Sequence, residues 1–586
     1  MSHTRPAGIE TGAHFPSYNF SPGHHVTRLL RDVLSPMRDG TMLAMDILRP
    51  VEEDRYPVIL VRTPYDKVRF FASPMRRPFL DRMAARGYVV AVQDCRGRFN
   101  SDGAFDPYRQ EHDDGFDTIE WIAKQAWCDG NVGMIGRSYE GQTQWFAAAK
   151  APPALKAIVP FCSPPGNAFA NEPIWGGAMT LASAEWAFAL GRRTFQLPDL
   201  NTLLEKEHPY FEASPLSTMG EAAGTYSPFW EEWLRHPLMD EFWQSCGYDQ
   251  YHPSMTVPAL NVTGWWDLNF SGAIDNFVEM RRKGAGQRAR QGQRLVIGPW
   301  PHWPNIWQSR NDVDFGEDAL VDLDGYTARF LDFWLRGDTG NGLDEEAAVH
   351  IFVLGANEWW SANEWPLPGT EFQALYLDSN GAANTHDGDG CLRFDLPESP
   401  GHDSYISDPS DPIRTVFNMH DGPVDDRVVT GRPDILCYTT DAFTELTDIV
   451  GPVELDLYAS SSAPDCDWHV RLVDVHPDGC ARFLSRGVLR ARFRSGFDSL
   501  NFPEPNRIHN YKIDLGAVGI RLLPGHRLRV EICSSWFNRF DVNAQTGADN
   551  WMTSTLTPIS ATQRIYHTPH EASRIILPFI RPTLSS

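Results

Sequence analysis

The stretch that most constrains the fold spans residues 131–141, Asn-Val-Gly-Met-Ile-Gly-Arg-Ser-Tyr-Glu-Gly. An apolar segment runs into a turn that carries Ser138 between Gly136 and Gly141, and an alanine-rich helical pattern follows over residues 142–150. This order is typical of a nucleophile elbow, a sharp turn that holds a serine hydroxyl clear of a β-sheet. The common spelling G-x-S-x-G is not met, because Glu140 precedes the second glycine. Ser138 is therefore a candidate nucleophile, with an ordinary turn serine as the alternative.

The chain is too long for a single hydrophobic core. Its 586 residues predict about three domains, at roughly 150–200 residues per domain. The formal net charge of −24 at pH 7 repels phosphate, which argues against nucleic acid or an anionic membrane surface as a partner. The acidity also has a simpler interpretation, the solubility of a large protein. Twenty tryptophans are a high number, and such rings tend to line cores and apolar pockets.

Cysteine usage and the N-terminus indicate the compartment. The nine cysteines are scattered and include no C-x-x-C pair, which predicts buried free thiols in a reducing compartment. Residues 1–25 are polar and lack the apolar core of a signal peptide, and no apolar run reaches ~18 residues. We therefore expect a cytoplasmic, soluble protein.

The N-terminal region predicts a mostly parallel sheet. Residues 26–34 and 41–49 read as a hairpin around Asp39-Gly40, a turn that supplies the positive φ a hairpin needs. Continuous apolar runs at 58–61, 88–92 and 157–160 are typical of strands covered on both faces. Helical patterns separate these runs, and alternation of strand and helix favours a parallel sheet. The turn at residues 163–166, Ser-Pro-Pro-Gly, marks a boundary.

The rest of the chain predicts an insertion and a second domain. Residues 167–250 have no alternating strands but many aromatic side chains, so we expect a helical cap over the sheet. Parallel strands resume at 256–263 and 294–298, which makes the first domain discontinuous, residues 1–166 and 251–345. From residue 346 to residue 586, short strands punctuated by Gly, Pro, Asn and Asp predict a β-sandwich or jelly roll.

Partners for Ser138 follow the two resumed strands. A serine hydroxyl needs a base to remove its proton, and the base needs a third group that holds it in one tautomer. The strand at 256–263 ends in Gly-Trp-Trp-Asp267, and the strand at 294–298 ends in Gly-Pro-Trp-Pro-His302. Both lie just past the carboxyl end of a parallel strand, where α/β sheets place their active sites. The order Ser, Asp, His along the chain is that of the α/β-hydrolase triad.

With these residues the chain resembles the cocaine esterase and X-Pro dipeptidyl-peptidase family of α/β-hydrolases, which also includes the α-amino-acid ester hydrolases. The resemblance covers nearly all of the chain, and the family's elbow reads G-x-S-Y-x-G, the spacing found here. The shared segments are Ser35-Pro36-Met37-Arg38-Asp39-Gly40, Pro64-Tyr65-Asp66-Lys67, Gln93-Asp94-Cys95-Arg96-Gly97-Arg98, residues 127–134, Gly136-Arg137-Ser138-Tyr139-Glu140-Gly141, Trp265-Trp266-Asp267, Gly298-Pro299-Trp300-Pro301-His302, residues 472–479 and Leu523-Pro524-Gly525-His526-Arg527.

The resemblance implies roles for individual residues. Ser138 would be the nucleophile, His302 the base and Asp267 the orienting acid. The oxyanion hole would consist of the Tyr65 hydroxyl and the backbone N–H of Tyr139. The family's fold is a hydrolase domain with a helical cap and a C-terminal jelly roll, as expected above.

The implied substrate is an ester with a bulky or aromatic apolar acyl group. α-Amino-acid ester hydrolases carry carboxylates two and three residues beyond the triad acid, and these bind the substrate's ammonium; here the positions are Asn269 and Phe270. A cationic amine would lack its counter-charge, which favours neutral acyl groups. We also do not expect the N-terminal extension that is typical of the X-Pro peptidases. The predicted substrate pocket is formed by Trp145, Trp175, Trp266 and Trp303.

The sequence is also compatible with other functions. The same triad would serve an amide or β-lactam acylase, or an Xaa-Pro-type peptidase. A protein of another class, a noncatalytic carbohydrate-binding protein, would use the jelly roll and keep the hydrolase half as scaffold. No cofactor is expected, and without H-E-x-x-H or Cys/His spacing no metal is expected either. The turn Asp408-Pro409-Ser410-Asp411 reads as a solvated loop rather than a calcium site, and a homo-oligomer is compatible with the sequence.

Overall fold

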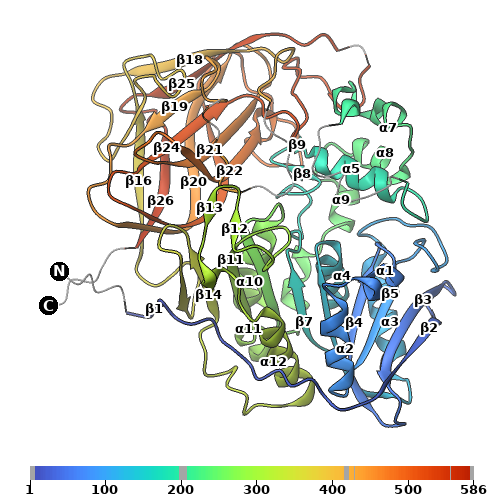
Figure 1. Cartoon of the computed structure of the whole chain (residues 1–586). Coiled ribbons are helices and arrows are strands. Elements are labelled where there is room, and N and C mark those ends of the chain that lie inside the picture. Colours follow the sequence, from blue (N-terminus) through green and yellow to red (C-terminus); the bar gives the residue numbers. More distant parts are fainter. Residues whose placement is uncertain are drawn as a thin grey trace.

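The computed structural model describes residues 7–580, apart from 197–207, 415–421, 426, 428 and 555. Figure 1 shows a sheet flanked by helices, a helical cap above it, and a β-rich domain beside both. The predicted α/β class is confirmed, as is the all-β character of the C-terminal part. No helix within the described ranges combines the length and apolarity that crossing a membrane requires.

The first sheet has 11 strands in the order β1-β15-β14-β11-β10-β7-β6-β4-β5-β3-β2. Strands β14 to β5 in this order run parallel, and antiparallel strands complete both edges. The bounds are β1 (Ile9–Thr11), β2 (Thr27–Pro36), β3 (Met42–Pro50), β4 (Tyr56–Thr63), β5 (Val89–Asp94), β6 (Cys128–Arg137), β7 (Leu155–Phe161), β10 (Leu260–Trp266), β11 (Arg294–Pro301), β14 (Val349–Val353) and β15 (Glu358–Ala362). The central strands are buried along their length, as their continuous apolar runs predicted.

Helices cover both faces of this sheet. Side chains of α3 and α4 pack in the core on one face, and those of α2 and α12 pack in the core on the other. The bounds are α1 (Lys67–Ala72), α2 (Arg77–Ala85), α3 (Glu111–Ala123), α4 (Tyr139–Ala149), α10 (Phe270–Lys283), α11 (Gly286–Gln291) and α12 (Leu323–Arg336). The acidic first turn of α3 complements the positive end of its helix dipole.

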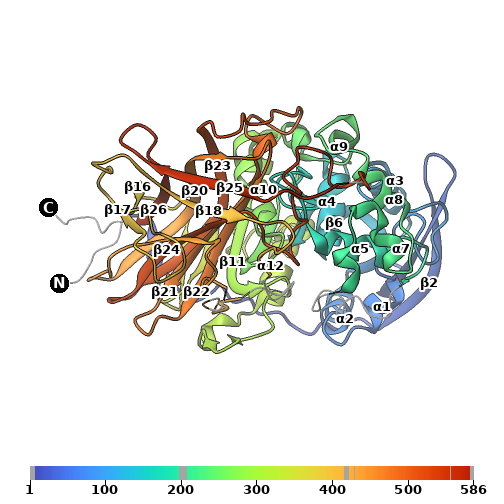
Figure 2. The ribbon, with the colours of Figure 1, turned by 90° about the horizontal axis from the view of Figure 1, so that it is seen from above.

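The insertion between β7 and β10 is mainly helical, as predicted. It contains α5 (Leu181–Leu190), α7 (Met219–Ala222), α8 (Pro228–Leu234) and α9 (Glu241–Ser245), with the short strands β8 (Ile174–Trp175) and β9 (Ala178–Met179). Apart from Trp175, its described tryptophans and phenylalanines belong to, or pack against, the same continuous hydrophobic core as the sheet below. Viewed from above, the cap helices lie over α3, α4 and β6 (Figure 2). A small hairpin, β12 (Ser309–Arg310) and β13 (Val313–Asp314), follows β11.

The C-terminal domain is built mainly from antiparallel strands, with one parallel pair, β17 and β19, and is the expected jelly-roll-like β domain. Its main sheet path is β18-β25-β20-β26-β16-β17-β19-β24-β21-β22, and β23 pairs with β20. The bounds are β16 (Thr370–Asp378), β17 (Cys391–Arg393), β18 (Gly401–Ser407), β19 (Leu436–Thr439), β20 (Thr447–Ser461), β21 (Asp467–Val475), β22 (Ala481–Arg490), β23 (His509–Leu522), β24 (Arg527–Cys533), β25 (Ala561–His567) and β26 (Arg574–Ile580).

The predicted start of the β domain, residue 346, lies before two strands that belong to the first sheet. Strand β14 pairs with β11 in parallel, with Leu295 opposite Val349, and β15 pairs with β14 in turn. Both strands therefore extend the first sheet, and the strands of the β domain begin at β16. The sequence was misleading because a short edge strand followed by a turn looks the same in either sheet.

Candidate active site

The structure builds a strained turn at Ser138. The serine has φ 62° and ψ −128°, a combination that costs energy for a residue with a side chain and that active sites often retain. Its backbone N–H donates to the Phe161 carbonyl at 2.9 Å, which holds the turn against the end of β7. A Cβ at Gly136 would lie 2.5 Å from Cβ of Glu140, and one at Gly141 would lie 3.2 Å from the Phe161 carbonyl oxygen. Both glycines are required by these close approaches.

Glu140 explains the unusual glycine spacing. Its side chain is buried, and its carboxylate accepts hydrogen bonds from the Thr63 hydroxyl at 2.9 Å and from Arg76 at 3.0 Å. The Thr63 hydroxyl oxygen in turn accepts the backbone N–H of Tyr65 at 3.1 Å. The carboxylate thus connects the serine turn to the loop that carries Tyr65, so the residue after Tyr139 has a structural task that glycine could not perform.

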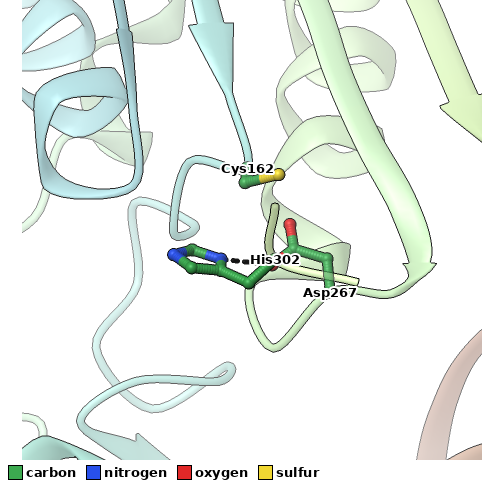
Figure 3. A group of neighbouring side chains, drawn as sticks. All are labelled: Cys162, Asp267 and His302. Carbon is green, nitrogen blue, oxygen red and sulfur yellow. Dashed lines mark hydrogen bonds and ion pairs between the residues drawn. The ribbon is translucent and has the colours of Figure 1, made fainter. Parts of the chain in front are cut away.

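Asp267 and His302 form a buried pair at the ends of β10 and β11. Nδ1 of His302 donates to Asp267 at 2.6 Å, and the dashed line in Figure 3 marks this contact. The carboxylate also accepts the Asn269 N–H at 3.1 Å and the Thr263 hydroxyl at 2.8 Å. Burial alone would raise the pKa of Asp267, but the charge and hydrogen bond of His302 hold it below its ordinary value. Because the carboxylate is ionised and Nδ1 donates to it, Nε2 of His302 is left to accept a proton.

Cys162 is a third side chain at this pair that sequence reasoning did not find. It follows β7, is fully buried, and points toward the Asp267 carboxylate (Figure 3). Ligand atoms of Cys162, Asp267 and His302 all lie within 4.8 Å of one another. Its φ of 46° is left-handed, and its N–H donates to the Val262 carbonyl at 2.7 Å. Burial, then the charge of Asp267, raise the pKa of the Cys162 thiol, which therefore stays protonated.

Tyr65 lies beside Ser138, and its hydroxyl interacts with the serine side chain. The hydroxyl oxygen also accepts the indole N–H of Trp186 at 2.9 Å. Since an indole can only donate, this bond leaves the phenol proton free to point elsewhere. Burial raises the pKa of Tyr65, so the hydroxyl stays protonated. Tyr139 begins α4, where backbone N–H groups have no partner within the helix.

One cavity of about 310 Å³ brings the predicted residues together. It is lined by Ser138, His302, Tyr65, Tyr139 and Trp303, while Asp267 lies behind His302. Its volume is at the lower end of the range for small-molecule sites. Cap residues close one side, among them Trp186, which was not among the four tryptophans predicted for the pocket.

Three of the four tryptophans predicted for the pocket do not line this cavity. Trp145 is fully buried and stacks on Tyr248 at 6.0 Å, because it lies two helical turns beyond Ser138. Trp266 packs on Phe315 at 5.3 Å, since neighbouring residues of a strand point to opposite sides. The third, Trp175, packs on a phenylalanine of the C-terminal domain, Phe540. Trp303 does line the cavity, with the guanidinium of Arg137 over its ring at 3.2 Å.

Two carboxylic acids and three arginines line the same cavity: Asp66, Glu172, Arg69, Arg76 and Arg137. Burial lowers the pKa of Arg137 to about 9, which leaves it cationic at neutral pH. Burial raises the pKa of Glu172 to about 8, with the charge of Arg539 acting in the opposite direction. At neutral pH the acid Glu172 is therefore mainly protonated, and the cavity walls carry more positive than negative charge.

Two groups of side chains among the described residues have the composition and closeness of metal ligands. The first is Cys162, Asp267 and His302, and the second is Asp474, His476 and His526 in the β domain. In the first group, His302 and Asp267 are hydrogen-bonded to each other as a proton-transfer pair, and this role explains why they lie close together.

Comparisons with known proteins cover both halves of the chain. The family model for X-Pro dipeptidyl-peptidase (S15 family) matches residues 39–304, and that for the X-Pro dipeptidyl-peptidase C-terminal non-catalytic domain matches residues 341–576. Cocaine esterase of Rhodococcus sp. (strain MB1 Bresler) is 35% identical over 94% of this chain and 98% of its own.

Two solved structures are similar over the full length. An α-amino acid ester hydrolase has a TM-score of 0.82 at 28% identity, covering 97% of this chain and 98% of its own. An aminopeptidase from a marine sediment archaeon, Thaumarchaeota archaeon, also has a TM-score of 0.82, at 27% identity and the same coverage. The shape of the whole chain, cap and β domain included, is therefore shared with hydrolases.

Proposed function

The chain belongs to the X-Pro dipeptidyl-peptidase (S15) family of serine hydrolases, which includes cocaine esterase, and we propose that it cleaves carboxylic esters through an acyl-enzyme. The observation that carries the proposal is the single cavity that holds both Ser138 and His302, with Asp267 bonded to His302 at 2.6 Å. These side chains come from the carboxyl ends of β6, β10 and β11, the edge at which α/β sheets bind substrates.

In the proposed mechanism Ser138 is the nucleophile. Nε2 of His302 takes the hydroxyl proton as the serine oxygen forms a bond to the ester carbonyl carbon. Asp267 stays ionised and stabilises the imidazolium. Collapse of the tetrahedral intermediate breaks the bond to the alcohol, which leaves with the proton from His302. Water, deprotonated by the same imidazole, then releases the acid from the acyl-enzyme.

The oxyanion of the tetrahedral intermediate would be bound by two donors, the Tyr65 hydroxyl and the Tyr139 N–H. The contact of Tyr65 with Ser138 supports this role, and so does the bond from Trp186, which directs the phenol proton away from the indole. The start of α4 adds the positive end of a helix dipole at the same place.

For the acyl group we propose an uncharged, bulky or aromatic substituent. The aromatic side chains of Tyr108, Trp186 and Trp303 line the cavity and offer flat apolar surface. The arginines Arg69 and Arg76 on its wall would repel an ammonium group, in agreement with the absence of carboxylates at positions 269 and 270.

Glu172 favours a second candidate, hydrolysis of α-amino acyl esters or amides. It is a carboxyl group on the wall of the cavity that contains Ser138. Once ionised, it could pair with a substrate ammonium. Its raised pKa, about 8, makes this candidate the weaker one at neutral pH.

The test begins with a fluorophosphonate probe, which labels an activated serine covalently. We expect labelling of the full chain at Ser138 and none in Ser138→Ala. Hydrolysis of p-nitrophenyl esters of graded acyl size, against matched amides and α-amino esters, then ranks the candidates. Labelling that persists in Ser138→Ala would contradict the mechanism, whereas a preference for α-amino substrates would contradict only the acyl specificity.

A further inference from the structure

Asp474, His476 and His526 meet on one face of the β domain. Asp474 and His476 are two residues apart at the end of β21, so their side chains leave the strand on the same side. Strands β21 and β24 are antiparallel, with Val475 opposite Arg527. Continuing that register by one residue places His476 opposite His526, and their ring centroids are 4.4 Å apart.

The donor atoms converge at distances that suit a metal ion. One carboxylate oxygen of Asp474, Oδ2, lies 3.0 Å from Nδ1 of His526 and 3.3 Å from Nε2 of His476. All three ligand atoms lie within 4.8 Å of one another. In a tetrahedral zinc site with bonds of about 2.0–2.1 Å, neighbouring ligand atoms are roughly 3.3 Å apart. Two edges of that tetrahedron are therefore already present to within a few tenths of an ångström.

The backbone holds the two histidine-bearing turns together. A Cβ at Gly525, which has φ +91°, would lie 3.1 Å from Cγ of Pro477, so the turn before His526 packs directly on the turn after His476. The second turn is closed by the His476 N–H, which donates to the Cys480 carbonyl at 2.8 Å. Ligands presented by two packed turns lose little freedom on binding an ion.

The site is sheltered but reachable. The side chains of Asp474 and His526 are 7% and 11% exposed, whereas that of His476 is 34% exposed. Solvent can therefore reach the group from the side of His476, where water could complete the coordination.

We propose that Asp474, His476 and His526 bind a first-row divalent metal ion such as Zn²⁺, which fastens the turn between β21 and β22 to the start of β24. Two imidazoles and one carboxylate are ligands that suit zinc and its neighbours and disfavour Mg²⁺. The sequence predicted no metal, because Asp-x-His is separated from its third ligand by the whole of β22 and β23 and matches no known spacing. The site does not involve Ser138, so the metal-binding proposal can be tested independently of the esterase proposal.

The test uses the full chain after treatment with chelator and exchange into metal-free buffer. Titration calorimetry with ZnCl₂ should show one binding event per chain and a raised thermal midpoint, while MgCl₂ should show neither. His476→Gln should weaken Zn²⁺ binding by at least about 10- to 100-fold, the range caused by losing even a group that hydrogen-bonds to a ligand. His476 is the most exposed of the three, so this variant is expected to fold. His570→Ala, an exposed histidine of the same domain, is the matched control and should bind as the wild type does.

Co²⁺ distinguishes this site from the group around Cys162. An ion held by nitrogen and oxygen shows no thiolate charge-transfer band, whereas an ion on the Cys162 thiolate would show one. Unchanged Zn²⁺ binding in His476→Gln would overturn the proposal. So would a thiolate band with Co²⁺, or no saturable binding at about 1 mM Zn²⁺. Loss of binding in His476→Gln and retention in His570→Ala is the result expected.

Discussion

The hydrogen bond from Trp186 to Tyr65 allows the oxyanion hole to be tested with a double-mutant cycle. Tyr65→Phe removes the hydroxyl that is proposed to donate to the oxyanion. Losing one such donor costs roughly 10²- to 10³-fold in kcat. Trp186→Phe keeps the hydroxyl but removes the 2.9 Å bond that directs its proton. A neutral hydrogen bond contributes about 0.5–1.5 kcal/mol, and at 1.36 kcal/mol per tenfold this predicts a loss of about 2- to 13-fold.

The double variant separates a role through Tyr65 from a role in packing. If Trp186 acts only on the Tyr65 hydroxyl, Trp186→Phe should have almost no further effect once Tyr65 is Phe. The assay is steady-state hydrolysis of a p-nitrophenyl ester, with the acylation burst measured separately and thermal midpoints recorded for every variant.

Trp230 offers a matched control in the same cap. It is buried on α8, and its indole nitrogen has no hydrogen-bond partner within the described part of the chain. Trp230→Phe should therefore leave kcat close to that of the wild type. Equal losses from Trp186→Phe in both backgrounds, or an equal loss from Trp230→Phe, would refute the orienting role. A loss below tenfold in Tyr65→Phe would refute the oxyanion donor itself.

Four further predictions concern Ser138, Glu172 and Cys162. Ser138→Ala should lower kcat by about 10⁴-fold or more with the thermal midpoint retained, and a variant that keeps a tenth of the rate would exclude Ser138 as nucleophile. Burial raises the pKa of Glu172 to about 8, so this side chain should ionise as the pH rises through that value. The kcat/KM for neutral esters should therefore fall on the alkaline side, and this decline should be absent in Glu172→Gln. Because the pKa of Glu172 is higher in the folded protein, its contribution to the free energy of unfolding should be largest below pH 4.5, the ordinary pKa of a glutamate, and should decrease as the pH rises toward 8. Denaturant unfolding of the wild type and of Glu172→Gln at a series of pH values checks this trend. Cys162→Ala should lower kcat by about 2- to 10-fold, because the Asp267 carboxylate loses a neighbouring polar group. Cys162→Ser should recover part of the rate. Equal rates in the two variants would show that the thiol contributes only by packing.

The parts of the site that the sequence predicted are those that depend on local pattern and strand order. The elbow at Ser138 is a local strand, turn and helix, and its glycines follow from close approaches within the turn. Asp267 and His302 follow consecutive parallel strands, and parallel strands bring their carboxyl ends to one edge. The pairing of these two side chains at 2.6 Å is the outcome that this order favours.

The parts that could not be predicted depend on where a side chain points after folding. Trp186 reaches Tyr65 across a distance of 121 residues in sequence, from an insertion whose docking no periodicity describes. Glu172 and Cys162 lie in irregular segments beside β8 and β7, where no pattern indicates an inward direction. Sequence neighbours of the triad were misleading for the same reason: Trp266 adjoins Asp267 but faces Phe315.

The position of Trp186 in the cap has a consequence for chimeric enzymes. Trp186 belongs to the cap, whereas the tyrosine that it contacts follows β4 of the sheet. On the proposed mechanism, exchanging this cap for that of a relative would replace the wall of the acyl cavity and the group that aims the phenol proton in a single step. Acyl preference and turnover would then be inherited together, so a grafted cap has to be judged on both.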